Sequence, residues 1–544
     1  MNKKLFLSVT VVMVSVLVCA TLFVSCRSVK TEVEPLPAPS NLEYCLTRTE
    51  NLDFIFNTDT IGKTTIVIKR SEWNKLCDDY RYFYKNENCV HAECYVYEKD
   101  GRAWTLENVG FRLRGNTSRI CPQGIDNGRE QGQKSYTWNP DYFHYAEKPN
   151  DDYRQSHFKV DFEEFLADDE EQKMAGCLKG IALKRMDNSC TREIFCYDLF
   201  RKNGIWTAPR ASHTRLLLNI IEDLEDNSVT TVNFGVYEMF EEVNKQSLKE
   251  RDSENYAAPN AWKNNKGNLW KGHCDLTSGS IDQAGVEDIR IFYEGETMEG
   301  KNLVYKEDGN GRIGYVFDSY NLDLKTNKDK FDSAKKELNG FITELNNLPD
   351  VKDESDVAAI EQIKAFYEKW FDMDFFLKTY AINILCGMDD DYWGNKNNYY
   401  LYFDTGKNGT GKVYFIPFDY DNSLGNSIFE GGFEHNPLEW GRGENRPLID
   451  KLIQVPEYKQ KFIDYLLEVS SNEYWNYERC SQLFKDWGAM CSPYLYSSDL
   501  NCRYIGVNHF YTDYIWCNPG YSLVHKYNNL YDATRKSFEK WLVK

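Results

Sequence analysis

The sequence predicts an α+β fold, in which a mixed sheet is followed by a helical lobe with an inserted acidic β-hairpin. Short stretches of alternating apolar and polar residues fill the first half, and longer stretches with helical spacing fill the second. No internal repeat or Pro/Ser/Gly linker divides the chain after residue 42, so one large domain is expected over about 50–544. Its expected parts are a β-rich part at about 50–250, a polar insertion at about 252–328 and a helical part at about 329–544.

The strands are expected from period-2 alternation and β-branched or aromatic residues. In Phe158-Lys159-Val160-Asp161-Phe162, for example, Phe158, Val160 and Phe162 share one face and Lys159 lies on the other. The stretch 120–156, rich in Gly and Tyr, shows no period and is expected to be a long loop. The expected strands are 64–69, 92–97, 104–114, 157–162, 180–184, 214–220 and 231–241.

The helices are expected from 3.6-residue spacing and from capping residues. The helix expected over 191–203 ends at Asn203-Gly204, and Asn244 is expected to begin another helix. Residues 252–328 are polar and are expected to be irregular. The later expected helices are 329–347, 355–386, 446–470 and 474–488.

The most informative feature is a pair of aromatic strands, 397–404 and 412–421, joined by a turn that contains Gly and Asn. Asp389-Asp390-Asp391 precede the first strand, and Asp419 and Asp421 close the second. Pairing Phe403 with Lys412 brings residues near 396 opposite residues near 419, so the carboxylates are expected to converge. Like charges that converge need a cation, and oxygen ligands suit Mg²⁺ or Mn²⁺. The alternative is an ordinary solvated acidic turn.

The first residues resemble the leader of an exported bacterial lipoprotein. Lys3 and Lys4 form a basic region, an apolar run covers residues 5–24, and Ser25-Cys26 is similar to a lipobox. We expect residues 1–25 to be a signal peptide, Cys26 to be lipidated and 26–49 to be a tether rich in proline. The expected location is the bacterial cell envelope, at the outer membrane, with contact through the lipid anchor alone. An uncleaved membrane anchor is the alternative.

Composition limits the partners and the metal chemistry. The net charge of −19 argues against nucleic acid as a partner. The cysteines contain no CxxC pair, which argues against a structural zinc site. In an oxidising compartment some cysteines could pair, with Cys89 and Cys94 and the C-terminal run as candidates. That run consists of Cys480, Cys491, Cys502 and Cys517.

An ordered set of motifs resembles the spore-coat CotH kinase family over roughly residues 50–544. The motifs lie in both halves of the chain, and their order and spacing together make the resemblance specific. They are Phe111-Arg112-Leu113-Arg114-Gly115-Asn116-Thr117-Ser118-Arg119, Phe158-Lys159-Val160-Asp161-Phe162, Gly235-Val236-Tyr237-Glu238-Met239-Phe240-Glu241-Glu242-Val243, Asp390-Asp391-Tyr392-Trp393, Asn398-Tyr399-Tyr400-Leu401-Tyr402 and Ile416-Pro417-Phe418-Asp419-Tyr420-Asp421-Asn422.

The resemblance implies a diverged protein-kinase-like fold and ATP-dependent phosphate transfer to protein hydroxyls with Mg²⁺ or Mn²⁺. Three kinds of site residue are implied. They are the catalytic acids Asp390 and Asp391, the nucleotide-binding residues Lys159, Glu241 (as the ion-pair partner of Lys159) and Arg114, and the metal ligands Asp419, Asn398 and Asp421. The run of three Asp residues leaves the register open, so Asp391 or Asp389 could take the place of Asp390.

Structural alternatives exist for three of these residues. Lys159 could be an ordinary solvated lysine, Arg114 could form a structural ion pair, and Glu241 could cap the helix that begins near Asn244.

The function expected from these residues is phosphorylation of Ser or Thr in exported proteins. Two alternatives remain. An inactive kinase-like scaffold on the cell surface would not need ATP outside the cytoplasm. A metal-dependent hydrolase of phosphoesters or glycans would use the same carboxylates, although none of the eight histidines lies in the acidic motifs.

Overall fold

The computed structural model separates the chain into two units, Met1–Pro37 and Ala38–Lys544. The whole first unit, which includes Cys26, lies outside the described residues. No helix in the described part is long and apolar enough to cross a membrane. The described residues are 48–82, 87–115, 119–123, 153–167, 170–185, 191–224, 227–285, 303–307, 313–317, 321–424, 436–440, 446–495, 502–503, 540 and 542.

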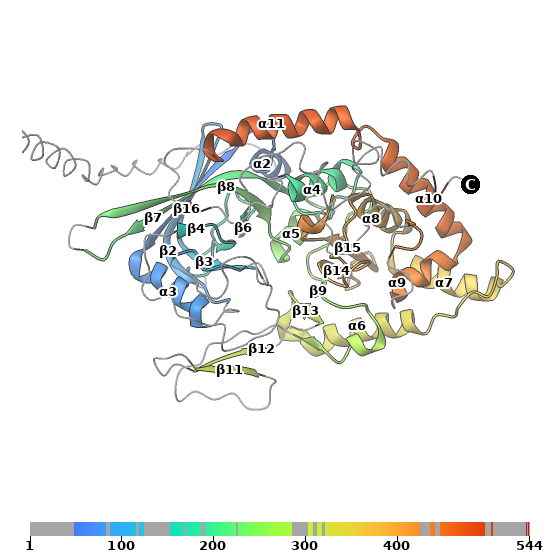
Figure 1. Cartoon of the computed structure of the whole chain (residues 1–544). Coiled ribbons are helices and arrows are strands. Elements are labelled where there is room, and N and C mark those ends of the chain that lie inside the picture. Colours follow the sequence, from blue (N-terminus) through green and yellow to red (C-terminus); the bar gives the residue numbers. More distant parts are fainter. Residues whose placement is uncertain are drawn as a thin grey trace, which may run out of the picture. The chain divides into compact units, whose positions relative to one another are not determined.

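The first half forms a closed barrel of the strands β1-β2-β3-β5-β6-β8-β7 (Figure 1). Neighbouring strands run antiparallel except β1 and β7, whose parallel pairing closes the barrel. The strands are β1 (Gly62–Lys69), β2 (Val90–Lys99), β3 (Arg102–Leu113), β5 (Phe158–Asp161), β6 (Gly180–Arg185), β7 (Ala211–Ile221) and β8 (Val229–Glu241). The strands expected in this part are all present, and the mixed α+β class is confirmed.

Alternation along the barrel strands separates two environments. Phe158 and Val160 of β5, and Ile181 and Leu183 of β6, pack into the barrel core. That core is extended by α2 (Arg48–Ile55) and α3 (Arg70–Tyr82). Side chains in between point outward, because successive strand residues face opposite sides. Ala182 of β6 accordingly packs with α4 (Arg192–Lys202), so Lys184 two residues later is also directed toward α4.

The second sheet has the strand order β10-β13-β9-β14-β15. Its strands are β9 (Asn268–Gly272), β10 (Ala284–Gly285), β13 (Leu322–Leu324), β14 (Tyr399–Asp404) and β15 (Lys412–Pro417). The expectation that residues 252–328 are irregular is therefore wrong, because β9 pairs with β14 along its whole length. The same region contains the pair β11 (Leu303–Glu307) and β12 (Ile313–Phe317).

The aromatic alternation of β14 fills a core on each face of this sheet. Tyr399, Leu401 and Phe403 pack into the main core with the C-terminal helices. Tyr400 and Tyr402 pack on the other face with Trp206 and Trp262. A strand that is buried on both faces is apolar or aromatic at every position, which explains the unbroken run of aromatic residues.

The main core is covered by the expected helices, with corrected boundaries. The stretch 355–386 is two helices, α7 (Val357–Trp370) and α8 (Met373–Cys386), because Asp372 accepts a bond from the backbone N–H of Phe375 and starts α8 anew. The remaining helices are α5 (Lys245–Glu250), α6 (Phe331–Asn346), α9 (Pro447–Asp450), α10 (Pro456–Ser471) and α11 (Tyr477–Leu495).

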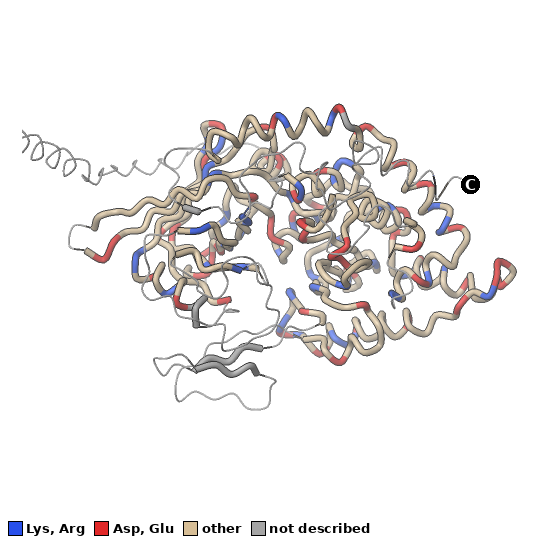
Figure 2. Tube along the Cα trace, in the orientation of Figure 1, with Lys and Arg blue, Asp and Glu red and all other residues tan. Residues whose placement is uncertain are grey.

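Charged residues of both signs lie along most of the described elements (Figure 2). The cysteines Cys89, Cys94 and Cys491 are free thiols, so the first disulfide candidate is not formed. Cys517 lies outside the described residues.

Candidate functional site

Lys184 connects the barrel to the acidic hairpin. Its Nζ donates to Glu193 Oε2 of α4 at 2.6 Å and to Asp419 Oδ1 at 2.5 Å. Asp421 Oδ2 lies 3.2 Å from the same nitrogen. The Lys184 and Glu193 side chains are 8% and 3% exposed, whereas those of Asp419 and Asp421 are 33% and 31% exposed. One buried cation therefore joins three carboxylates, two of which reach solvent.

The charges in this group shift one another's titration. Although burial opposes it, the negative charges of Asp419, Asp421 and Glu193 raise the pKa of Lys184 well above its usual value. Burial raises the pKa of Glu193 to about 7, although Lys184 opposes the shift. Burial and the charge of Asp419 raise the pKa of Asp421 to about 6. The group therefore contains more negative charge than Lys184 neutralises.

The hairpin positions Asp419 by its register. Tyr399 pairs with Pro417 and Asp404 with Lys412, so the register differs by one residue from the expected pairing of Phe403 with Lys412. The Asp404 carboxylate accepts the backbone N–H of Thr410, which shapes the turn. The expected meeting of residues near 396 with residues near 419 holds within one residue.

Two residues at this end of the hairpin have left-handed backbones. Asn398 has φ +51° and Asp419 has φ +61°. Residues other than glycine adopt this region infrequently, and such positions concentrate at functional sites. Pro417 ends β15, and a 3₁₀ turn over Tyr420–Asn422 follows Asp419.

Asp390 faces the same group and is held by amides. Its Oδ1 accepts from Asn395 at 2.8 Å, and its Oδ2 accepts from Asn398 at 3.2 Å and from Asn422 at 3.0 Å. Burial and the charge of Asp419 raise the pKa of Asp390. Donation from the Asn398 amide nitrogen leaves its amide oxygen available as a ligand.

Asp391 points into the protein instead. It is 1% exposed, and its Oδ1 accepts the backbone N–H of Gly394 at 2.9 Å. A Cβ on Gly394 would lie 2.0 Å from the Asp389 carbonyl oxygen, so this turn requires glycine. Arg446 stabilises the same turn, because its guanidinium group donates to the carbonyl oxygen of Tyr392 at 3.1 Å. The structure thus brings Asp390, and not Asp391, close to Asp419 and Asp421, whereas Asp391 shapes the loop.

The donors present fit a hard divalent cation. Asp390, Asp419 and Asp421 supply carboxylate oxygens and Asn398 supplies an amide oxygen, which are the ligand types that Mg²⁺ and Mn²⁺ prefer. Burial first, and then the negative charge of Asp419, raises the pKa of both Asp390 and Asp421, and a bound cation would oppose that shift. In the described part of the chain, no three Asp, Glu, His or Cys side chains are already gathered closely enough to hold a metal.

The expected ion pair between Lys159 and Glu241 is wrong. Lys159 Nζ lies 2.6 Å from Glu242 Oε2, the next residue along the chain. Lys159 points outward from the barrel, and Glu242 follows the end of β8. Although burial opposes it, Lys159 and then Arg114 lower the pKa of Glu242.

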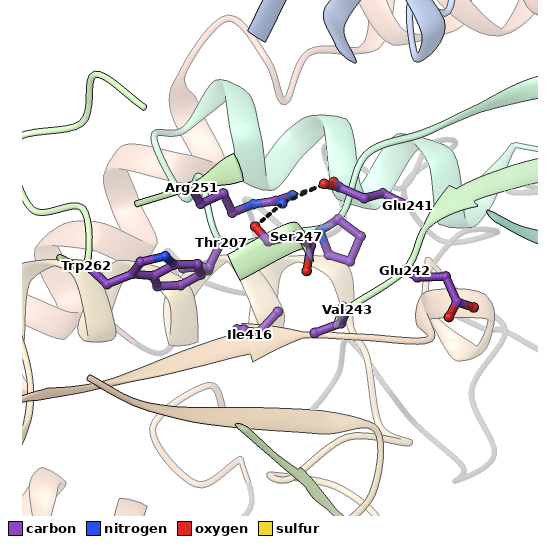
Figure 3. Close-up of a pocket in the computed structure, with 9 residues that line it drawn as sticks. Thr207, Glu241, Glu242, Val243, Ser247, Arg251, Trp262 and Ile416 are labelled. Atoms are coloured by element: carbon purple, nitrogen blue, oxygen red, sulfur yellow. Dashed lines mark hydrogen bonds and ion pairs between the residues drawn. The ribbon is translucent and has the colours of Figure 1, made fainter. Parts of the chain in front are cut away.

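Glu241 is held by arginines. Its carboxylate accepts two bonds from Arg251, at 2.7 and 2.5 Å, and its side chain is 2% exposed. Although burial opposes it, Arg251 and Arg210 lower the pKa of Glu241 to about 2. Figure 3 shows Glu241 pointing toward Arg251 while Glu242 points away from it, beside a pocket with room for about one water molecule. Glu241 therefore fixes α5 to the end of β8, and does not cap α5, whose N-cap is Asn244.

Arg114 lies just after β3, where its backbone N–H donates to the carbonyl oxygen of His157 at 2.9 Å. Burial raises the pKa of Asp419, but Lys184 and then Arg114 lower it below its usual value. The guanidinium charge of Arg114 therefore acts on Asp419.

Sequence reasoning missed Lys184 and Glu193. A signal was present, since Lys184 is the last residue but one of a largely apolar strand and Glu193 lies in the first turn of the helix that follows. The family resemblance implies Lys159 instead, through the motif Phe158-Lys159-Val160-Asp161-Phe162.

Comparison with known proteins agrees with the motifs. The model of the family described as CotH kinase protein matches residues 148–512, about two thirds of the chain. This range contains Lys184, Glu193, Asp390 and Asp419, and leaves out β1 to β3 and Arg114. Spore coat protein homolog 1 of Rhizopus delemar is 26% identical over 186 residues, which are 32% of this chain and 27% of that protein. The chain thus spans about a quarter of the length of this curated relative, and it belongs to the CotH kinase family.

Proposed function

We propose that the chain is an ATP-dependent phosphotransferase that phosphorylates Ser or Thr hydroxyls of exported proteins with Mg²⁺ or Mn²⁺. The observation that carries the proposal is the contact of Lys184 with Glu193 and Asp419 at one end of the hairpin, with Asp390 beside them. Phosphoryl transfer requires positive charge on the phosphates, oxygen ligands for the metal and a group that orients the attacking hydroxyl. Family membership supports the same reaction class.

Each residue has a role that its surroundings suit. Lys184 would neutralise nucleotide phosphates, with Glu193 fixing the direction of its ammonium group. Asp419, Asp421 and the Asn398 amide oxygen would hold the metal, which supplies charge stabilisation for the transferring phosphoryl group. Asp390, whose raised pKa makes it a better proton acceptor, would orient and deprotonate the acceptor hydroxyl. Arg114 would add positive charge at the phosphates.

The contacts of Lys184 indicate what nucleotide binding must change. Its ammonium group is shared among carboxylates, so phosphate oxygens would replace part of that contact. Asp419 and Asp421 would then be released toward the metal. This exchange of partners supports a site in which metal and nucleotide bind together.

We propose that the protein is a lipoprotein of the bacterial cell envelope, anchored at the outer membrane through Cys26 alone. The support is the leader motif, since Cys26 lies outside the described residues. We also propose that its partners are proteins and that nucleic acid is not among them, because the chain has a net charge of −19.

The deciding experiment is transfer of label from γ-³²P-ATP by the purified full chain in detergent, with and without Mn²⁺. We expect label on Ser or Thr of the protein itself or of added exported proteins, and none with Asp419→Asn. Asp464→Asn, which alters an exposed carboxylate of α10, is the matched control. Nucleotide binding without any transfer would contradict the proposal and favour the inactive scaffold.

A further inference from the structure

The hydroxyl of Tyr197 connects Glu193 with Asp419, two residues whose carboxylates both contact Lys184. Tyr197 lies in α4, one turn after Glu193, and its hydroxyl donates to Glu193 Oε1 at 3.1 Å. The hydroxyl oxygen of Tyr197 also accepts a hydrogen bond from the backbone N–H of Asp419, at 2.8 Å. Since Lys184 binds the other oxygen of Glu193 and the side chain of Asp419, the four residues form a closed ring of hydrogen bonds.

The hydrogen bond from the Asp419 backbone N–H to Tyr197 lies at a residue with an unfavourable backbone conformation. Asp419 has φ +61° and ψ +60°, which is the left-handed region. A residue with a Cβ remains there only when its surroundings hold it. Lys184 holds the carboxylate of Asp419, and Tyr197 holds its backbone N–H, so both ends of the residue are fixed.

The Tyr197 ring is itself immobilised. It is 1% exposed, it meets Phe240 edge to face with 5.8 Å between ring centres, and it lies 5.9 Å from the Tyr420 ring. A phenol hydroxyl has one hydrogen to donate and lone pairs with which to accept, so Tyr197 can bind both partners at once.

We propose that Tyr197 is a positioning residue, which holds Asp419 in its left-handed conformation and aligns it with the Lys184–Glu193 pair. This inference rests on the proposed function, because alignment matters most if Asp419 binds the metal that serves phosphate transfer. A residue that acts by positioning Asp419 should affect kcat more than the affinity for nucleotide. A misplaced Asp419 would hold the metal in a poorer position to stabilise the charge of the transition state.

The test is Tyr197→Phe, which removes one oxygen and keeps the ring. Tyr367→Phe is the matched control. Tyr367 lies in α7 and is equally buried, and its hydroxyl donates to the carbonyl oxygen of Leu448 at 2.6 Å. Four quantities are measured on the full chain: kcat and KM for ATP, Mn²⁺ affinity by electron paramagnetic resonance, and hydrogen exchange at the amide of Asp419 by mass spectrometry.

In Tyr197→Phe we expect kcat to fall by about ten- to a hundredfold while KM for ATP changes by less than about threefold. Mn²⁺ affinity should fall by about tenfold, and the Asp419 amide should exchange at least about fivefold faster. Tyr367→Phe should alter none of these.

Exchange at Asp419 that matches wild type, with unchanged kcat or Mn²⁺ affinity, would overturn the assignment. A wild-type protein that transfers no phosphate would refute the proposed function alone, because exchange at Asp419 would still decide whether Tyr197 holds it.

Discussion

Lys184 of β6 and Asp419 after β15 lie 235 positions apart in the chain, and their side chains meet at 2.5 Å. This contact joins the barrel to the second sheet at the same point where Asp390 and Asn398 gather. Residues from both halves of the chain are thus needed to complete the candidate site.

The first prediction distinguishes the two lysines. Lys184→Met should raise KM for ATP and lower kcat, with a combined loss in kcat/KM of about tenfold to a thousandfold, because the buried cation is lost from the proposed phosphate position. Lys159→Met should reduce kcat/KM by less than about threefold, because Lys159 pairs with Glu242. Steady-state kinetics at varied ATP measures both. Equal losses in the two variants would restore Lys159 as a phosphate-binding residue.

The second prediction concerns the metal. Calorimetric titration of the full chain with Mn²⁺ should show a site that Asp419→Asn abolishes. At a metal concentration one hundred times Kd, binding should stabilise the wild type by about 2.7 kcal/mol and raise its melting temperature. Asp464→Asn should bind and melt as the wild type does. Identical titrations of wild type and Asp419→Asn would place the metal elsewhere.

The third prediction concerns acid stability. The pKa of Glu241 is about 2 in the folded chain and about 4.5 when unfolded, so its contribution is complete above pH 4.5 and disappears as the pH falls toward 2. The contribution is on the order of 3 kcal/mol. The melting temperature of Glu241→Gln should lie below that of wild type at pH 7, and the difference should shrink as pH falls through this window. Glu457→Gln, at an exposed pair with Lys364, should follow wild type at every pH. A difference that does not depend on pH would refute the assignment.

The fourth prediction compares two glycines. Gly394→Ala forces a Cβ to within 2.0 Å of a carbonyl oxygen, so it should destabilise the Asp390 loop by roughly 1–3 kcal/mol and reduce phosphate transfer. Gly340→Ala lies in the exposed part of α6 with no atom near the new Cβ, and it should stabilise the protein by about 0.5–1 kcal/mol. Chemical denaturation measures both changes. A neutral Gly394→Ala variant would show that the turn tolerates a side chain.

The fifth prediction concerns the leader. Cys26→Ala should release the protein from membranes or leave it unprocessed, because the proposed lipid anchor would be attached to that thiol. Fractionation and intact mass of the chain expressed in bacteria measure this, with Cys45→Ala as the control. If Cys26→Ala matured and fractionated as the wild type does, Cys26 would not be the anchor.

The sequence predicted the elements that repeat a short-range pattern. The strands of the barrel alternate with period 2, and Asn203-Gly204 and Asn244 mark helix ends where the structure has them. The split between α7 and α8 depends on the single cap Asp372, which is weak against a continuous apolar spacing. Strand β9 was missed because its side chains become buried only when β13 and β14 pair with it.

The candidate site could be predicted only where its residues are close in sequence. The hairpin brings Asp390, Asn398 and Asp419 together through local pairing, so spacing predicts it. The lysine could not be chosen in this way, because Lys159 and Lys184 both occupy strands and only the position of α4 distinguishes them. Glu241 was misassigned because Arg251, which neutralises it, comes from the opposite end of α5.

The parallel pairing of β1 with β7 has a consequence for how the chain reaches its fold. Thr64 and Thr214, whose hydroxyls meet at 2.9 Å, are 150 positions apart, so this seam of the barrel joins distant parts of the chain. Contacts of such sequence separation form slowly, because the intervening chain must be ordered first. During synthesis, β1 must remain unpaired on this side until β7 has emerged. The rate at which the barrel closes, measured by refolding, should therefore depend on interactions between β1 and β7 more than on any single hairpin.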